Sequence, residues 1–302
     1  MEVFPDYYPE FRCIGGSCQH NCCIGWEIDI DEDTLALYQN IDGELGERLK
    51  KHIALQETPH FQLDAFDRCP FLNSDNLCDL IIGLGEDSLC QICTDHPRFR
   101  NKLPDRTEIG VGLCCEAAGR LILGKENPTH LIGASETDDE IIAVRDEMIA
   151  LLQDRSMPIK NRIDALPCNI DFSLLNPWAD FLLSLERLED GWTELLELLH
   201  EKADLVGFDA HMQDRQTEYE QFAVYLLYRH AANAADELDF AARIAFAVLG
   251  YHILYTLGAV LWTKNGQFTF DDQVELARRF SAEIEYSDDN LNAVFDALAF
   301  GY

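Results

Sequence analysis

The chain has 302 residues, of which 47% are hydrophobic, and its 55 Asp and Glu against 23 Lys and Arg give a net charge of −32. This apolar content supports one large core or two ordinary ones and excludes a disordered or fibrous protein. A strongly negative surface repels phosphate backbones and anionic membranes, so we expect no nucleic-acid partner. It favours a cationic partner, such as a lysine-bearing protein surface, although a simple solubility shell explains the same charge.

The first 124 residues are predicted to form a module of brief elements. The chain starts with MEVFPDYYPEF, which lacks the basic and apolar parts of a secretory signal, so we expect a cytoplasmic protein. Alternation of polar and apolar residues predicts short strands at 26–30, 61–66 and 107–113. Helical periodicity predicts helices at 33–39, 44–55 and 115–123.

The remainder of the chain is predicted to be helical. A polar stretch at 124–139 reads as a linker, and Thr137 with Glu140 forms a capping-box pattern that should start a helix ending near residue 154. Further helices are predicted at 178–189, 192–205, 213–232, 236–263, 271–284 and 288–299. The expected fold is therefore mainly α: a cysteine-rich N-terminal module with a few short strands (1–124), followed by an α-helical C-terminal domain (137–302).

One apolar stretch raises the question of a membrane span. Residues 244–262 contain no Asp, Glu, Lys or Arg, and His252 is their single histidine. The stretch is long enough to cross a bilayer. It is interrupted by Gly250 and Gly258, its N-terminal flank is acidic, and the neighbouring predicted helices are rich in charge. We therefore expect the buried central helix of a globular domain rather than a membrane span.

Ten of the 11 cysteines lie between Cys13 and Cys115, and only Cys168 lies outside. Disulfides need an oxidising compartment, which the missing signal argues against, and a cysteine nucleophile needs one thiol rather than ten. Metal ligation explains both the number and the grouping. Soft thiolates select zinc, copper(I) or iron–sulfur centres and exclude hard cations.

The cysteine spacing defines the neighbourhood of this metal centre. The groups are C-x4-C-x3-C-C from Cys13, a pair in CPFLNSDNLC, C-x2-C in LCQICTDHPRF, and the vicinal pair in GLCCEAAGR. Ligands spread over four segments favour an iron–sulfur cluster; zinc is the alternative, with His20 and His96 available for a mixed site. A single cubane takes four thiolates, so the spacing does not choose among the candidate ligands. These are Cys18, Cys22, Cys23, Cys69, Cys78, Cys90, Cys93 and Cys114, with Cys13 marginal.

Two features beside the cysteines suggest further chemistry. Asp95-His96-Pro97-Arg98 directly follows Cys93, so His96 and Arg98 could hydrogen-bond the metal ligands or bind an anionic cofactor group. The alternative is a loop that only holds the metal centre in place. Glu116 follows two thiols at the start of a predicted helix, where it could act as a base or simply stabilise the helix end.

These motifs together resemble the flagellin lysine-N-methylase family, which shares its cysteine signature with zinc- or iron-chelating cysteine-cluster domains. FRCIGGSCQHNCCIGWEIDID, CPFLNSDNLC, LCQICTDHPRF and LCCEAAGRLIL occur in the family's order, and YLLYRH at 225–230 and FSAEIEYSDDNL at 280–291 are similar to later landmarks. Ala282 and Tyr286 depart from the Arg and His of the last motif. Cys115 replaces the family's Pro and is therefore an extra thiol rather than a ligand.

The resemblance implies methyl transfer from S-adenosylmethionine to lysine side chains of flagellin, with a [4Fe–4S] cluster required for activity. A lysine ammonium must lose a proton before it can attack, so desolvation or a nearby base is needed. Glu116, Glu285 and Tyr286 are the candidate catalytic residues. Two alternatives stay open: an electron-transfer or otherwise non-catalytic cysteine-cluster protein, and a zinc-stabilised interaction module.

Overall fold

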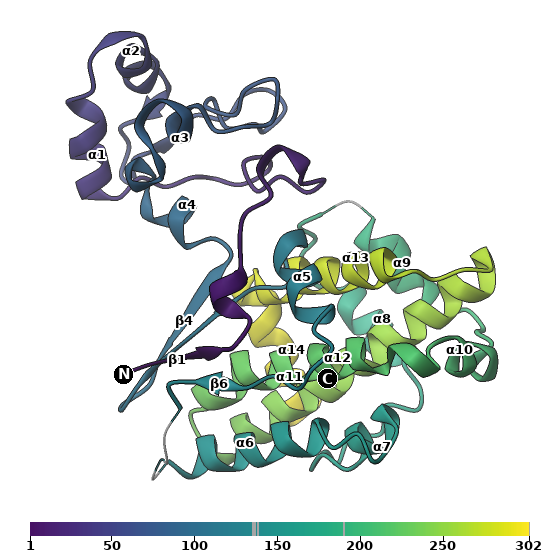
Figure 1. Cartoon of the computed structure of the whole chain (residues 1–302). Coiled ribbons are helices and arrows are strands. Elements are labelled where there is room, and N and C mark those ends of the chain that lie inside the picture. The colour runs from purple at the N-terminus through teal and green to yellow at the C-terminus, as the bar shows by residue number, and fades with distance from the viewer. Residues whose placement is uncertain (135–136, 138, 190, 302) are drawn as a thin grey trace. The chain divides into compact units, whose positions relative to one another are not determined.

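The computed structural model describes residues 1–134, 137, 139–189 and 191–301 (Figure 1). The strands are β1 (Glu2–Pro5), β2 (Ile53–Ala54), β3 (His60–Phe61), β4 (Arg98–Lys102), β5 (Thr107–Val111) and β6 (Leu131–Ile132). The α-helices of the first 132 residues are α1 (Glu32–Gln39), α2 (Gly43–His52), α3 (Asp79–Leu84), α4 (Gln91–Asp95) and α5 (Glu116–Leu123). The later ones are α6 (Glu140–Leu152), α7 (Ile159–Asp164), α8 (Asn176–Leu183), α9 (Trp192–Leu198), α10 (Leu205–His211), α11 (Gln216–His230), α12 (Glu237–Asn265), α13 (Phe270–Phe280) and α14 (Asp288–Phe300). The predicted mainly α fold with few, short strands is confirmed.

The chain divides into two compact units. One is Arg12–Arg98, and the other joins Met1–Phe11 to Phe99–Tyr302. This division differs from the predicted boundaries 1–124 and 137–302, because the first strand belongs with the helical unit. β1 pairs in parallel with β5 (Val3 opposite Glu108) and antiparallel with β6 (Phe4 opposite Ile132). The stretch expected to be a linker therefore contributes a sheet strand, and residues 99–123 lie in the helical unit.

A four-stranded sheet in the order β4-β5-β1-β6 is attached to the helices of its unit by buried polar groups. The Tyr228 hydroxyl donates to the carbonyls of Val3 (2.9 Å) and Ile109 (3.1 Å), which ties α11 to β1 and to β5. Arg145 of α6 forms a bidentate ion pair with Glu108 of β5, and neither side chain is exposed. Such a charge-assisted pair fixes the geometry of the sheet against the helices.

Several predicted elements differ in length or position from the observed ones. The predicted strand 26–30 is reduced to one isolated bridge, Asp29–His60, and the strand predicted at 61–66 shortens to β3. The strand predicted at 107–113 ends at Val111. The helix cap lies at Asp139, whose carboxylate accepts from the amides of Ile141 and Ile142, so the Thr137–Glu140 capping box is wrong. A short polar side chain nearer the first turn outcompetes the threonine.

The C-terminal helices confirm the helical prediction with three corrections. The helix expected at 178–189 ends at Leu183, and the one expected at 192–205 ends at Leu198 before α10 begins. The helix expected at 271–284 ends at Phe280 and continues as a π-helical turn, Ser281–Glu285. Wider turns of this kind re-aim side chains and are frequent at functional sites.

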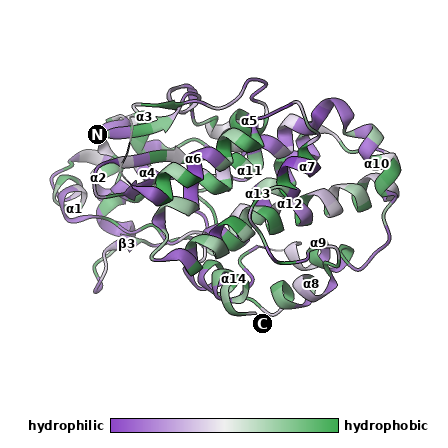
Figure 2. Cartoon of the chain, turned by 90° about the horizontal axis from the view of Figure 1, so that it is seen from below, coloured by the Kyte–Doolittle hydropathy of each residue, from purple (hydrophilic) through white to green (hydrophobic). Residues whose placement is uncertain are grey.

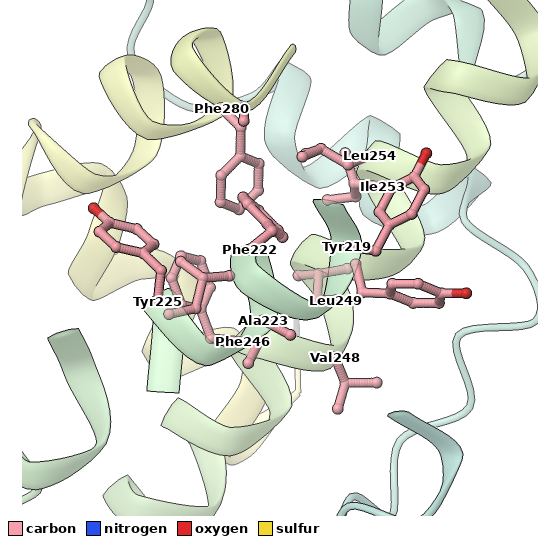
Figure 3. Packing of buried hydrophobic residues seen from close by; sticks show 14 of the residues in the cluster. Tyr219, Phe222, Ala223, Tyr225, Phe246, Val248, Leu249, Ile253, Leu254 and Phe280 are labelled. Atoms are coloured by element: carbon pink, nitrogen blue, oxygen red, sulfur yellow. The ribbon is translucent and has the colours of Figure 1, made fainter. Parts of the chain in front are cut away.

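The core of the larger unit lies around α11 and α12. Figure 3 shows Phe222 and Tyr225 of α11 packed with Phe246 of α12 and Phe280 of α13. In Figure 2 hydrophobic residues recur along both α11 and α12. Helix α12 is long and apolar enough to cross a membrane, but 78% of its most apolar window is buried inside the protein. This burial fits the predicted central core helix.

Candidate functional site

Five cysteines of the unit Arg12–Arg98 lie in or against one small core, and together with the exposed Cys22 beside Cys23 we call them the thiol cluster. They come from three segments of the chain: Cys22 and Cys23, Cys69 and Cys78, and Cys90 and Cys93. Cys69 and Cys90 are buried in a core that also contains Tyr38, Phe61 and Phe71. Cys23, Cys78 and Cys93 pack against this core, so the three segments meet there.

Backbone pairing brings two of the three segments together. The Cys69 amide donates to the Cys23 carbonyl (2.8 Å), beside the bridge between Ile24 and Arg68. A tight turn then returns the chain from Cys69 to Cys78. In this turn the Asn73 side chain accepts from the amides of Asp75 and Leu77, both at 3.0 Å. The polar tip of CPFLNSDNLC thus has a structural role, which is to fix the separation of two thiols.

The thiols are arranged as pairs. The sulfurs of Cys90 and Cys93 lie 3.3 Å apart across the first turn of α4. A hydrogen bond from the Cys23 side chain lowers the pKa of Cys22 to about 7. Burial is the main reason that the pKa of Cys69 is raised to about 11. In the part of the chain that the structure describes, no group of three or more His, Cys, Asp or Glu side chains is arranged to hold a metal ion.

The remaining predicted ligands have other surroundings. Cys13 is exposed, and its sulfur accepts from the Gly15 amide (3.4 Å). The Cys18 thiol donates to the His20 carbonyl (3.3 Å). Cys114 belongs to the other unit, where it is buried beside Tyr286. The structure therefore brings together six of the eight candidate ligands within one unit.

The predicted cofactor-binding residues follow the last cysteine of the cluster. The His96 ring lies edge-on to Trp26 with centroids 5.5 Å apart, and burial lowers the pKa of His96 to about 4. His96 is thus neutral at physiological pH. The Arg98 guanidinium donates to the Thr94 carbonyl (2.9 Å), closing the end of α4. Nothing in this geometry assigns either residue a ligand.

A second candidate site surrounds Glu285 in the helical unit. The carboxylate of Glu285 accepts from the Tyr225 hydroxyl at 3.1 Å and is 2.6 Å from His230 Nε2. Arg229 Nε lies 3.4 Å from the same carboxylate, and the Glu285 side chain is fully buried. We call Tyr225, Arg229, His230, Glu285 and Tyr286 the Glu285 cluster. Two segments supply it: the end of α11 and the π-helical turn after α13.

Aromatic rings enclose the Arg229 guanidinium. Its central carbon lies 4.9 Å from the Tyr286 ring centroid, 5.0 Å from that of Phe99 and 6.0 Å from that of Tyr225. Cation–π attraction of this kind gains strength when the cation is desolvated. Gly112 lies against the same group: a Cβ there would collide with the Tyr286 hydroxyl and come within 3.0 Å of Arg229 Nη1. The turn between β5 and α5 therefore requires glycine at this position.

The charges of the Glu285 cluster balance internally. Burial alone would raise the pKa of Glu285, but Arg229 and His230 outweigh it and hold that pKa below its usual value. Burial lowers the pKa of His230 and raises the pKa values of Tyr225 and Tyr286. The cluster at neutral pH is thus an ionised Glu–Arg pair with neutral His and Tyr side chains, a pre-organised array of dipoles in a water-poor environment.

The predicted catalytic residues are distributed over two places. Glu285 and Tyr286 both belong to the Glu285 cluster. Glu116 begins α5, is buried, and forms an ion pair with Arg120 (3.3 Å), which also contacts Asp271. Three cluster members were absent from the predicted set: Tyr225, Arg229 and His230. The YLLYRH segment could have pointed to them, because an Arg and a His there end a helix that is otherwise apolar and buried.

Comparison with known proteins places a family-model match in the helical unit. Residues 164–301 match the family model described as the FliB lysine N-methylase C-terminal domain. Over 126 residues, the chain is 28% identical to a lysine-N-methylase of Salmonella typhimurium (39% of this chain, 31% of that protein) and to one of Salmonella choleraesuis. It is 27% identical to the flagellar biosynthetic protein FliU of Salmonella muenchen over 39% of this chain and 75% of that protein.

These matches confirm the predicted resemblance to the lysine-N-methylase family. The alignment spans about a third of the length of the curated lysine-N-methylases. The family model matches the C-terminal part of this chain, residues 164–301. No solved structure matches. The range that the family model matches includes every residue of the Glu285 cluster, whereas the thiol cluster lies outside it.

Proposed function

We propose that this protein methylates lysine side chains of flagellin, with S-adenosylmethionine as methyl donor. The supporting observation is that residues 164–301, which match the lysine N-methylase C-terminal domain, include all members of the buried Glu285 cluster. The same range contains α12, whose burial fits a core helix. The cytoplasm is the proposed location, since free thiols persist there.

The reaction sets a clear requirement on the protein. The neutral lysine Nζ must attack the methyl carbon of the sulfonium, the S–CH3 bond breaks with its electron pair going to sulfur, and the new N-methylammonium then releases a proton. An unperturbed lysine has a pKa of about 10.4 and is protonated at neutral pH. Desolvation lowers that pKa, because burial disfavours the charged form. The protein must therefore supply a water-poor site and a proton acceptor.

The Glu285 cluster suits the positioning part of this task. Glu285 already accepts hydrogen bonds and pairs with Arg229, so its carboxylate orients Arg229, Tyr225 and His230. Tyr286 presents its ring to Arg229 and its hydroxyl to the turn that contains Gly112. We propose Glu285 and Tyr286 as the residues that shape the catalytic site. Glu116, which is less tightly enclosed, is proposed as the proton acceptor.

The surface charge supports a lysine-bearing substrate. With a net charge of −32, the protein attracts cationic patches and steers their approach. Flagellin, or another protein with exposed lysines, fits this preference, and no nucleic-acid partner does.

We further propose that the thiol cluster holds a [4Fe–4S] cluster required for activity. A zinc ion needs its ligand atoms at about 2.0–2.3 Å from one point, and the residues that the structure describes offer no such group of three. A cubane takes one thiolate at each of four irons, so its ligand sulfurs stand apart. The sulfurs of Cys90 and Cys93 lie 3.3 Å apart and would have to separate to serve as two ligands. Buried thiols also supply the soft donor set that iron–sulfur centres require. Bound there, the cluster would supply structural cross-linking or electron-transfer chemistry.

We propose that His96 and Arg98, which follow the last cysteine of the thiol cluster, help to bind the cofactors. A neutral His96 can hydrogen-bond without adding charge, and Arg98 can contact the carboxylate of S-adenosylmethionine.

The test uses the whole protein, reconstituted anaerobically with iron and sulfide. It is incubated with flagellin and S-adenosylmethionine, and flagellin peptides are analysed by mass spectrometry for lysines that are heavier by one methylene group. We expect such lysines only when both protein and S-adenosylmethionine are present. Flagellin that stays unmodified, while iron and sulfide are stoichiometric, would favour the electron-transfer alternative.

A further inference from the structure

A groove on the helical unit is formed by α9, α12 and α13, and we call it the α9–α13 groove. It encloses about 560 Å3. Four leucines from the three helices line it: Leu195 and Leu198 from α9, Leu261 from α12 and Leu276 from α13. Leu276 is buried and the other three are half-buried. A hollow of this size, with an apolar lining and a few polar groups, is typical of a binding site.

Acidic side chains border these leucines. The groove is also lined by Glu194, Asp272 and Glu275, and Arg279 is the basic residue of the lining. The Arg279 guanidinium donates to the Glu275 carboxylate at 2.6 Å, so its charge is balanced within the groove. Glu194 and Asp272 are both exposed to solvent. Three carboxylates against one guanidinium leave the lining with a net negative charge.

A lysine side chain fits both properties of this lining. It has an apolar stem and a cationic tip, so the stem can lie on the leucines while the ammonium group reaches the carboxylates. A second copy of this chain is a poor occupant, because each copy carries a net charge of −32 and the two would repel. The same charge disfavours nucleic acid and anionic lipid. The occupant that fits is a protein segment that presents lysines beside apolar side chains.

The groove is joined to the Glu285 cluster through the turn that follows α13. This helix lines the groove and leads directly into the π-helical turn Ser281–Glu285. The Glu283 carboxylate accepts from the amides of Leu188 (3.2 Å) and Glu189 (2.5 Å), just before α9. Arg278 forms a bidentate ion pair with Glu189, at 2.9 and 2.8 Å. The walls of the groove and the turn that carries Glu285 are therefore parts of one hydrogen-bonded frame.

We infer that the α9–α13 groove is the docking site of the substrate protein and takes a lysine-bearing, amphipathic segment onto its leucines and carboxylates. The inference rests on the proposed methylation of a lysine-bearing protein and adds the place at which that protein is held. A docking contact is made equally in the ground state and in the transition state. Its loss therefore raises the KM for the protein substrate and leaves kcat unchanged.

The first experiment measures binding without methyl transfer. The probe is a fluorescein-labelled helical peptide of leucine and lysine, and its binding to the whole protein is followed by fluorescence anisotropy without S-adenosylmethionine. Glu194→Lys reverses a charge at the groove, and Leu198→Gln makes its lining more polar. Glu197→Lys is the matched control, since Glu197 is exposed on the same helix and does not line the groove. We expect the Kd to rise about tenfold in the two groove variants and less than about twofold in the control.

The second experiment measures the methylation of flagellin by the same proteins. The KM for flagellin should rise in Glu194→Lys, while kcat and the KM for S-adenosylmethionine stay unchanged, and Glu197→Lys should match the wild type. A wild-type protein that binds the peptide but leaves flagellin unmethylated would contradict the proposed reaction and support the groove.

Three results would overturn the docking site. They are no binding of the leucine–lysine peptide by the wild-type protein, equal Kd values in all four proteins, and equally tight binding of a leucine–glutamate peptide. Circular dichroism of each variant verifies that it is folded. Because Glu194 is exposed, its replacement tests the groove even if Leu198→Gln unfolds.

Discussion

Replacing Arg229 by Met tests the charge balance of the Glu285 cluster. Methionine keeps much of the side-chain length among the Phe99, Tyr225 and Tyr286 rings but removes the cation. It leaves the Glu285 carboxylate, whose side chain is fully buried, without its ionic partner. Breaking a buried ion pair by removing one partner costs about 3–5 kcal/mol, because the remaining charge is uncompensated.

The loss should depend on pH, and its sign follows from Glu285. In the wild-type protein the pKa of Glu285 is held below its usual value, so the pair stabilises the fold above the unfolded pKa and less as pH falls through the folded one. Without Arg229, burial raises the pKa of Glu285 above that of the unfolded chain. The variant should therefore lose more stability at pH 8 than at pH 5, where Glu285 can take up a proton.

The assay is urea-induced unfolding followed by circular dichroism at several pH values. Lys160→Met is the control, since its ion pair with Asp164 (2.6 Å) is exposed and should be worth about 0–1 kcal/mol at any pH. The double variant Arg229→Met/Glu285→Gln should recover part of the loss, because the buried charge is gone. A loss in Arg229→Met no greater than that in Lys160→Met, or one without pH dependence, would refute the reasoning.

Three further predictions concern separate parts of the molecule. Gly112→Ala should lower the free energy of unfolding by about 1–3 kcal/mol and abolish methyl transfer, because the added Cβ collides with the Tyr286 hydroxyl. The control is Gly119→Ala, where the nearest contact of the added Cβ is Val274 at 3.2 Å. It should lower the free energy of unfolding by less in the same urea assay. Because burial lowers the pKa of His230, folding stability should fall as pH drops below about 6.5; His230→Gln should flatten this slope in thermal unfolding, and an unchanged slope would contradict the assignment. Cys69→Ala and Cys90→Ala should lower the iron content after reconstitution, whereas Cys114→Ala and Cys168→Ala should retain it; iron loss in Cys114→Ala would show that the ligand set extends beyond the thiol cluster.

Local pattern was enough to predict three long helices of the C-terminal half, α11, α12 and α14. The apolar stretch 244–262 lies within α12 and is a buried core helix, as its glycines and acidic flank indicated. The pairing of β1 with β5 was not predictable, because it joins residues about a hundred positions apart and β1 has only four residues. The predicted domain boundaries differed from the compact units for this reason.

The candidate sites were predictable to different degrees. Cysteine spacing located the neighbourhood that contains Cys23, Cys69 and Cys90, but the turn that sets the separation of Cys69 and Cys78 depends on Asn73. Composition gave no sign that Tyr38 shares a core with Cys69 and Cys90, since its placement depends on how α1 is fastened to Gln91. The Glu285 cluster forms because a π-helical turn, which periodicity does not indicate, directs Glu285 toward the end of α11.

The most direct test of the proposed function follows the methyl group itself. Reconstituted protein is incubated with flagellin and S-adenosylmethionine that carries a deuterated methyl group, and the masses of lysine-containing peptides are measured. With the wild-type protein, we predict that flagellin lysines gain the mass of a fully deuterated methyl group. With folded Arg229→Met, the amount of labelled lysine should be strongly reduced. Unlabelled lysines in the presence of an intact metal centre would contradict it.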